Sequence, residues 1–199
     1  MEHEKDFLAD YRIEKYERPS VTADVAAFRV CHENQMQLLL IRRGGHPYKD
    51  MWALPGGFLE KGETVEECAL REMQEETTIR PDSLLPVGIF SEPERDPRGW
   101  IISSAYAAVF NADAVRQNAS DDAADAQWFA VSFQCSGDGN DLLTLTYADI
   151  RLEAVLAPEK NIFGKTSYRI LERGGLAFDH AAVIAAALAV LPPEMKRMV

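Results

Sequence analysis

This chain of 199 residues has few cysteines and no long hydrophobic segment, and each shortage excludes a class of protein. The three cysteines, Cys31, Cys68 and Cys135, are odd in number and widely spaced, so they form neither a disulfide framework nor a zinc-binding pattern. The apolar run at residues 181–191 is roughly half the ~20 residues needed to span a bilayer. The charged N-terminus also lacks the apolar core of a signal peptide. We therefore expect a cytoplasmic protein with no membrane partner.

The chain also has few basic residues: it contains 21 of them and 32 acidic residues, so its net charge is −11. A field of this sign disfavours contact with phosphate backbones, so we expect no nucleic-acid partner. A small phosphorylated ligand is still possible, because a metal ion or a local arginine cluster can reverse the sign inside one pocket.

The distribution of apolar residues predicts one α/β domain over residues 21–199, preceded by a charged arm at residues 1–20. From about residue 134 to 199 the pattern indicates a C-terminal β/α elaboration, and Asp179 is a plausible cap for its final helix at 180–191. The predicted strands cover residues 21–30, 37–42, 86–91, 101–110, 128–131, 142–147, 150–156 and 166–171.

Residues 64–77 read as a helix that begins with a capping box of Thr64 and Glu67. On this helix Glu72, Glu75 and Glu76 fall within one 100° arc, since they are spaced i, i+3 and i+4. Such a cluster is either a solvated acidic face or a set of ligands for a hard divalent cation. The spacing alone does not choose between these two interpretations.

The full string favours the metal site. Gly57 is followed after five residues by Glu63 and, after seven more, by the run Arg71-Glu-Met-Gln-Glu-Glu-Thr-Thr-Ile79. This string resembles the signature of the Nudix hydrolase family at residues 57–79 and matches every fixed position except Thr78, where the family has glycine. That glycine normally ends the helix in a left-handed turn, so we expect Thr78 to strain or reshape the helix exit.

The resemblance extends over about residues 20–131 and implies a Nudix fold, a mixed β-sheet between helices. It implies that Glu72, Glu75 and Glu76, together with Gly57, bind Mg²⁺, with Mn²⁺ as an alternative. Arg71 is then expected to orient the helix carboxylates by pairing with Glu63.

The resemblance also implies metal-assisted hydrolysis of a diphosphate, in which a carboxylate accepts a proton. Glu75, Glu76 and Asp122 are the candidates for this base, and the sequence does not choose among them. Asp122 is included because family members often add a carboxylate from a loop shortly before a tryptophan-containing strand.

The loop at residues 94–100 looks like the substrate loop of Nudix enzymes that cleave ADP-ribose to AMP and ribose 5-phosphate. Arg98, and with it Arg95, is placed to bind phosphate, although both are also consistent with ordinary solvated arginines. Trp52 is a candidate to stack on a base or to belong to the core, and Arg43 ends a strand close to the same region.

Two further interpretations stay open. One is a Nudix hydrolase for another nucleotide, such as NADH, a dinucleoside polyphosphate or a noncanonical nucleoside triphosphate. The other is a noncatalytic regulator that binds ADP-ribose, a class that often has a damaged glutamate set, whereas here the three glutamates are intact. The arm and the strands after Leu142 are unexplained by catalysis, and we expect them to form a homodimer.

Overall fold

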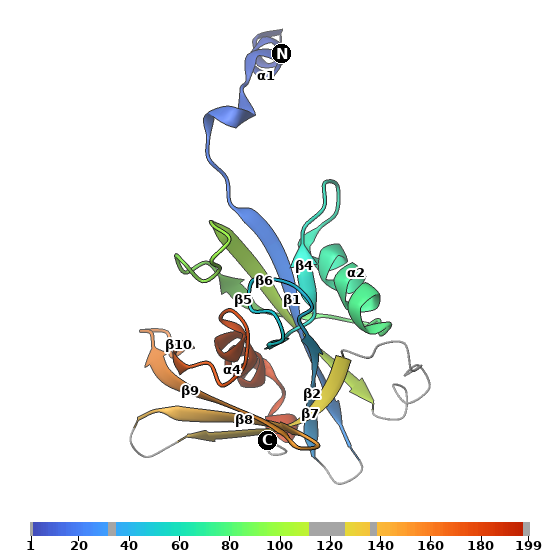
Figure 1. Ribbon diagram of the computed structural model, residues 1–199. Coiled ribbons are helices and arrows are strands. Elements are labelled where there is room, and N and C mark those ends of the chain that lie inside the picture. The colour runs from blue at the N-terminus through green and yellow to red at the C-terminus, as the bar shows by residue number, and fades with distance from the viewer. Residues whose placement is uncertain (1, 32–34, 112–125, 136–138, 197–199) are drawn as a thin grey trace.

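Ten strands form a single mixed sheet, which the computed structural model describes together with its helices over residues 2–31, 35–111, 126–135 and 139–196 (Figure 1). The strand order is β10-β9-β8-β7-β2-β1-β6-β5, with β3 paired to β2 and β4 to β1. Among the described strand pairs, only β1 and β6 run parallel. The strands are β1 Ser20–Val30, β2 Met36–Arg42, β3 Trp52–Ala53, β4 Gly56–Phe58, β5 Leu85–Phe90, β6 Ile101–Asn111, β7 Ala126–Cys135, β8 Asp141–Tyr147, β9 Ile150–Lys160 and β10 Thr166–Glu172.

Helices cover both faces of this sheet, as predicted. The helices are α1 Glu2–Asp10, α2 Val65–Thr77, α4 His180–Val190 and α5 Pro193–Lys196, with a 3₁₀ turn η1 at Ile13–Lys15. Each strand predicted from the sequence is present, and the capping box of Thr64 and Glu67 begins α2. The mixed sheet between helices is therefore confirmed.

The central strand β1 is buried on both faces, which explains its nearly continuous run of apolar residues. Ala23, Val25 and Ala27 face α2 and pack with Met73, whereas Phe28 belongs to the larger core on the other face. Side chains alternate between the two faces of a strand, so β1 joins the two halves of the core.

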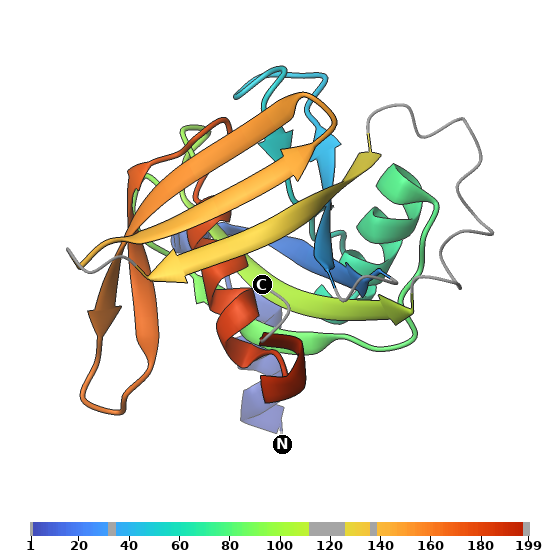
Figure 2. The same ribbon diagram turned by 90° about the horizontal axis from the view of Figure 1, so that it is seen from below.

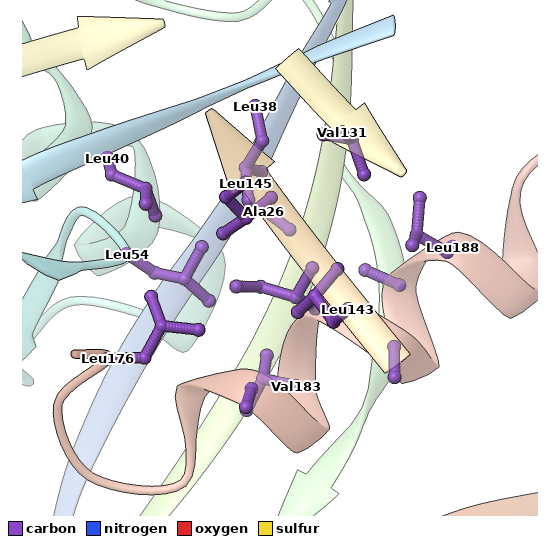
Figure 3. Packing of buried hydrophobic residues seen from close by; sticks show 14 of the residues in the cluster. Ala26, Leu38, Leu40, Leu54, Val131, Leu143, Leu145, Leu176, Val183 and Leu188 are labelled. Atoms are coloured by element: carbon purple, nitrogen blue, oxygen red, sulfur yellow. The ribbon is translucent and has the colours of Figure 1, made fainter. Parts of the chain in front are cut away.

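The larger core surrounds α4, and the sheet curves round this helix in both views (Figures 1 and 2). Figure 3 shows Leu143 of β8 close to Val183 of α4, while Leu145 of β8 lies beside Ala26 of β1 in the same cluster. An apolar helix must be buried, and eight of the eleven residues of α4 are buried.

A short segment before α4 is held against the strand β3 by main-chain hydrogen bonds. The Trp52 N–H donates to the Gly175 carbonyl at 3.1 Å, and the Ala177 N–H donates to the Trp52 carbonyl at 2.8 Å. The Leu54 N–H donates to Nδ1 of His180 at 2.9 Å. The C-terminal region is thereby attached to the loop that leads into β4 and α2.

The N-terminal arm, α1 with η1, points away from the sheet (Figure 1). Its apolar side chains are largely in solvent, since Phe7 and Leu8 are each 63% exposed and Tyr16 is 56% exposed. No helix in the described ranges is both long and apolar enough to cross a membrane.

Thr78 ends α2 in the left-handed conformation that the signature glycine would adopt, with φ 60° and ψ 5°. Its N–H donates to the Gln74 carbonyl at 3.0 Å, so the helix exit keeps the geometry typical of a left-handed cap. The substitution therefore stores strain and does not reshape the exit. A side chain in this region costs about 1–2 kcal/mol.

We expect Thr78→Gly to raise the free energy of unfolding by about 0.5–1 kcal/mol, because relief of this strain exceeds the entropy that glycine adds to the unfolded chain. The matched control is Thr77→Gly, which removes a buried hydroxyl bonded to Met73 inside the helix and should destabilise the protein. Urea unfolding measures both variants. A lower stability for Thr78→Gly would contradict the strain.

Candidate active site

Arg71, near the middle of α2, holds together several acidic groups. Its guanidinium donates to both oxygens of Glu63, at 2.9 and 3.2 Å, and to the Phe58 carbonyl at 3.0 Å. It also donates to Glu72 at 2.7 Å and to Glu75 at 3.2 Å. The pairing with Glu63 expected from the sequence is present, and it ties the loop before α2 to the acidic face of the helix.

These bonds keep both partners ionised. Hydrogen bonds from Arg71 and from the Glu60 N–H lower the pKa of Glu63 to about 2. The bonds to Glu63 and Glu72 in turn raise the pKa of the Arg71 guanidinium above its ordinary value. One permanent positive charge thus offsets the repulsion between carboxylates that share one face of α2.

Glu76 lies deeper than its neighbours. Burial raises the pKa of its carboxyl to about 7, and the negative charges of Glu72 and Asp24 raise it as well. The hydrogen bond from the Gly56 N–H and the positive charge of Arg43 lower this pKa, but by less. The Gly56 N–H donates to Glu76 Oε2 at 2.9 Å. A divalent cation beside this group would favour its ionised form.

The main chain of Gly57 lies directly beside the Glu72 carboxylate. A Cβ at position 57 would overlap all three atoms of that carboxylate, so only glycine allows this approach. Oxygen donors from a main-chain carbonyl and from glutamates are what Mg²⁺ prefers. The residues at this loop and helix therefore fit a hard divalent cation.

The carboxylates nevertheless do not form a finished site: within the described ranges, no three histidine, cysteine or acidic side chains gather closely enough to hold a metal ion. The three carboxylates are held apart by different hydrogen-bond donors. Arg71 binds Glu72 and Glu75, whereas the Gly56 N–H binds Glu76. A cation would have to compete with Arg71 for Glu75, whose side chain is 59% exposed and free to turn.

A pocket of about 60 Å³ opens beside this loop, and Gly56, Gly57, Arg43 and Arg98 are among the residues that line it. Arg98 pairs with the buried Asp96 at 2.7 Å. Arg95 also lines the pocket, and these three arginines outnumber the two aspartates of the lining, Asp24 and Asp96. In a protein with a net charge of −11, the pocket is therefore locally suited to an anion.

The lining of the pocket includes two members of a buried polar network, Asp24 and His180, that the sequence did not reveal. Asp24 accepts a short hydrogen bond from the Ser103 hydroxyl, and its other oxygen is 3.7 Å from Nε2 of His180. Because Nδ1 of His180 accepts from the Leu54 N–H, its proton is assigned to Nε2. Burial lowers the pKa of His180, so it is a neutral structural group at the start of α4.

Two predicted substrate residues make close contacts within the fold. Arg95 lines the pocket, but it is only 8% exposed and donates to both oxygens of Asp179, at 2.6 and 2.8 Å, and its contact with phosphate stays a prediction. Asp179 occupies the N-cap position of α4, but its side chain binds Arg95 in place of a helix N–H. Trp52 is 9% exposed and packs edge-on against Phe129, in agreement with the core position that the sequence also allowed. The burial of Arg95 and Trp52 and their contacts involve segments far away in the chain, so the local sequence does not predict them.

Most of the remaining predicted residues lie at the site, and one lies outside the residues that the structure describes. Glu72, Glu75, Glu76, Gly57, Arg71 and Glu63 lie together at the loop and α2, and Arg43 and Arg98 line the adjacent pocket. Asp122 lies outside the described residues. Cys68 is fully buried, and burial raises the pKa of its thiol to about 12, which excludes a thiolate nucleophile at neutral pH.

Comparisons with known proteins agree with this geometry. The model of the NUDIX domain family matches residues 22–132. The chain is 41% identical over 125 residues to an ADP-ribose pyrophosphatase of Methanocaldococcus jannaschii, a match that covers 63% of this chain and 69% of that protein. It is 36% identical over 151 residues to an ADPR-responsive transcriptional repressor of Acinetobacter baylyi, covering 73% of this chain but only 60% of the repressor. The crystal structure of a MutT/nudix family protein from Enterococcus faecalis superimposes with a TM-score of 0.73 at 30% identity, over 95% of this chain and 68% of that one.

We expect Gly57→Ala to weaken Mn²⁺ binding at least about 10-fold, since the added Cβ displaces the Glu72 carboxylate. The control is Gly44→Ala, because a Cβ at Gly44 meets nothing within 4 Å. Titration followed by electron paramagnetic resonance measures Mn²⁺ affinity, and circular dichroism checks that both variants fold. An unchanged affinity in folded Gly57→Ala would show that this approach of main chain to carboxylate is not part of the metal site.

Proposed function

The chain belongs to the NUDIX family, and on that premise we propose that it hydrolyses the diphosphate bond of ADP-ribose to give AMP and ribose 5-phosphate, with Mg²⁺ as cofactor. The observation that carries this proposal is one pocket in which Arg43 and Arg98 lie beside Gly56 and Gly57, the loop that the Gly56 N–H ties to Glu76 of the acidic helix. The similarity to an ADP-ribose pyrophosphatase supports the choice of substrate.

The proposed metal ligands are the carboxylates of Glu72, Glu75 and Glu76 and the main chain of Gly57, with Mn²⁺ as an alternative cation. When bound, the cation supplies polarisation of the phosphoryl oxygens and a lowered pKa for a coordinated water. Arg71 keeps the carboxylates on one side of the helix and holds the loop in place through Glu63.

The protein's own residues then bind and orient the diphosphate. Arg43 and Arg98, which line the pocket together with Gly56 and Gly57, neutralise phosphate oxygens. The pocket, at about 60 Å³, is small for a whole nucleotide, so adenosine and ribose extend along its rim. A carboxylate accepts the proton of the attacking water, and Glu75, Glu76 and Asp122 are the candidates.

Two other activities are tested beside this one. Hydrolysis of NADH, a dinucleoside polyphosphate or a noncanonical nucleoside triphosphate would use the same residues and differ only at the rim. A noncatalytic ADP-ribose-binding regulator is favoured by the similarity to the ADPR-responsive repressor. A substrate panel with Mg²⁺ separates these, because a regulator binds ADP-ribose tightly without turnover of any nucleotide.

We expect Glu75→Gln to lower kcat for ADP-ribose at least about 100-fold, because it removes a metal ligand or the base. Glu66→Gln is the control, since Glu66 is exposed in the first turn of the same helix. AMP release in the presence of Mg²⁺ measures both variants. A rate for Glu75→Gln close to that of the unaltered protein would overturn the assignment of the site.

We further propose that residues 21–199 form one cytoplasmic catalytic domain, that the arm at residues 1–20 pairs two copies, and that nucleic acid is not a partner. The exposed Phe7, Leu8 and Tyr16 support the pairing, because an isolated helix of nine residues is marginal in water. Removal of residues 2–16 should convert a dimer to a monomer in light scattering at micromolar concentration. A monomeric full-length chain would refute this.

A further inference from the structure

Two of the three arginines that line the pocket, Arg43 and Arg98, lie over the ring of Phe178, a residue outside both the signature and the family match. The guanidinium carbon of Arg43 is 4.8 Å from the centre of this ring, and that of Arg98 is 5.2 Å from it. Arg98 also lies 4.7 Å from the ring centre of Phe58. The negative face of an aromatic ring attracts cations, so Phe178 offers the two like charges a shared attraction.

The position of this ring is tightly determined. Phe178 is 5% exposed and has φ 51°, a left-handed conformation that is uncommon for a bulky residue. Arg173 Nε donates to the Phe178 carbonyl at 3.0 Å, and Tyr48 packs edge-on against the ring at 4.9 Å. Backbone strain that the surroundings hold in place is concentrated at functional sites.

The two arginines retain donors that the fold does not use. Arg43 donates through Nε to the Pro47 carbonyl at 2.8 Å, and no residue in the described ranges accepts a bond from its two terminal nitrogens. Arg98 gives Nε and Nη2 to Asp96, and within those same ranges its Nη1 has no acceptor. These donors belong to residues that line the pocket beside Gly56 and Gly57.

The charges make an anion the fitting occupant. Burial and the nearby charge of Arg98 lower the pKa of the Arg43 guanidinium, so the two cations repel each other across the pocket. A ligand that carries two adjacent negative groups relieves this repulsion and accepts bonds from both side chains. A single phosphate carries less negative charge and fewer acceptor oxygens for Arg43 and Arg98 than a diphosphate does.

We propose that Phe178 is a positioning residue whose ring holds Arg43 and Arg98 side by side, so that the pair recognises both phosphates of a nucleoside diphosphate. This inference rests on the proposed function for the identity of the substrate, but the recognition itself concerns only the diphosphate. The C-terminal elaboration thereby contributes a determinant of specificity to the site.

The test replaces Phe178 with fluorinated phenylalanines of increasing fluorine content, ending with pentafluorophenylalanine. These rings keep the size and shape of the side chain but progressively weaken and then reverse the attraction for a cation. We expect KM for ADP-ribose to rise stepwise, to about 10-fold for the pentafluoro ring, with kcat within about 2-fold of its original value. A packing role alone would leave KM unchanged across the series.

A second measurement is independent of turnover. In EDTA, the dissociation constant for ADP should rise about 10-fold in the pentafluoro variant and that for AMP much less, because only ADP engages both arginines. Phe178→Leu should give the same ratio, and thermal unfolding reports its stability separately. The control places pentafluorophenylalanine at Phe133, which packs on Tyr168 away from the pocket and should change neither constant.

The outcomes separate the two proposals. If the unaltered protein cleaves ADP-ribose but fluorination of Phe178 leaves KM and the ADP constant unchanged, the role of Phe178 is refuted and the enzymatic function stands. If ADP affinity follows the fluorine series while no ADP-ribose is cleaved, the diphosphate clamp stands and the proposed hydrolysis fails. An equal loss of ADP and AMP affinity would refute recognition of both phosphates.

Discussion

The mutual attachment of residues 52–54 and 175–180 is the constraint on which the site depends. Two main-chain hydrogen bonds at Trp52 and the bond from the Leu54 N–H to His180 join segments more than 120 residues apart in sequence. On one side of this junction the chain continues into Gly56, Gly57 and the acidic helix. On the other side it carries Phe178 into the same pocket. If this contact were lost, the acidic and basic halves of the site would no longer face each other.

Each half of the site gathers like charges and keeps them together by a different physical means. On α2 the carboxylates share the permanent positive charge of Arg71, which is locked by its bonds to Glu63. In the pocket the guanidinium groups of Arg43 and Arg98 lie over one aromatic ring, which attracts cations without neutralising them. Within the described ranges no carboxylate is bonded to Arg43, whereas Asp96 binds Nε and Nη2 of Arg98 and leaves Nη1 for a ligand. A protein of strongly negative net charge can therefore present a local anion site.

Periodicity and local motifs predicted the elements well, because strands, the capping box and the acidic arc of α2 depend on neighbouring residues. They did not predict the short strands β3 and β4, which are too brief to show a period. They did not reveal the pairing of Arg95 with Asp179, because the two residues lie far apart in the chain. The contacts of Phe178 with Arg43 and Arg98 were not predicted for the same reason.

The C-terminal strands contribute to the site through α4, although they lie away from the pocket. Because α4 is apolar on every side, it is stable only when strands cover it all round, and β8, with Leu143, supplies part of that cover (Figure 3). A stable α4 fixes His180 at its first turn, and His180 fixes Leu54. The apolar core is thus connected through one buried histidine to the loop that precedes Gly56. The elaboration after residue 134 therefore supports the geometry of the pocket by packing, in addition to carrying Phe178 into it.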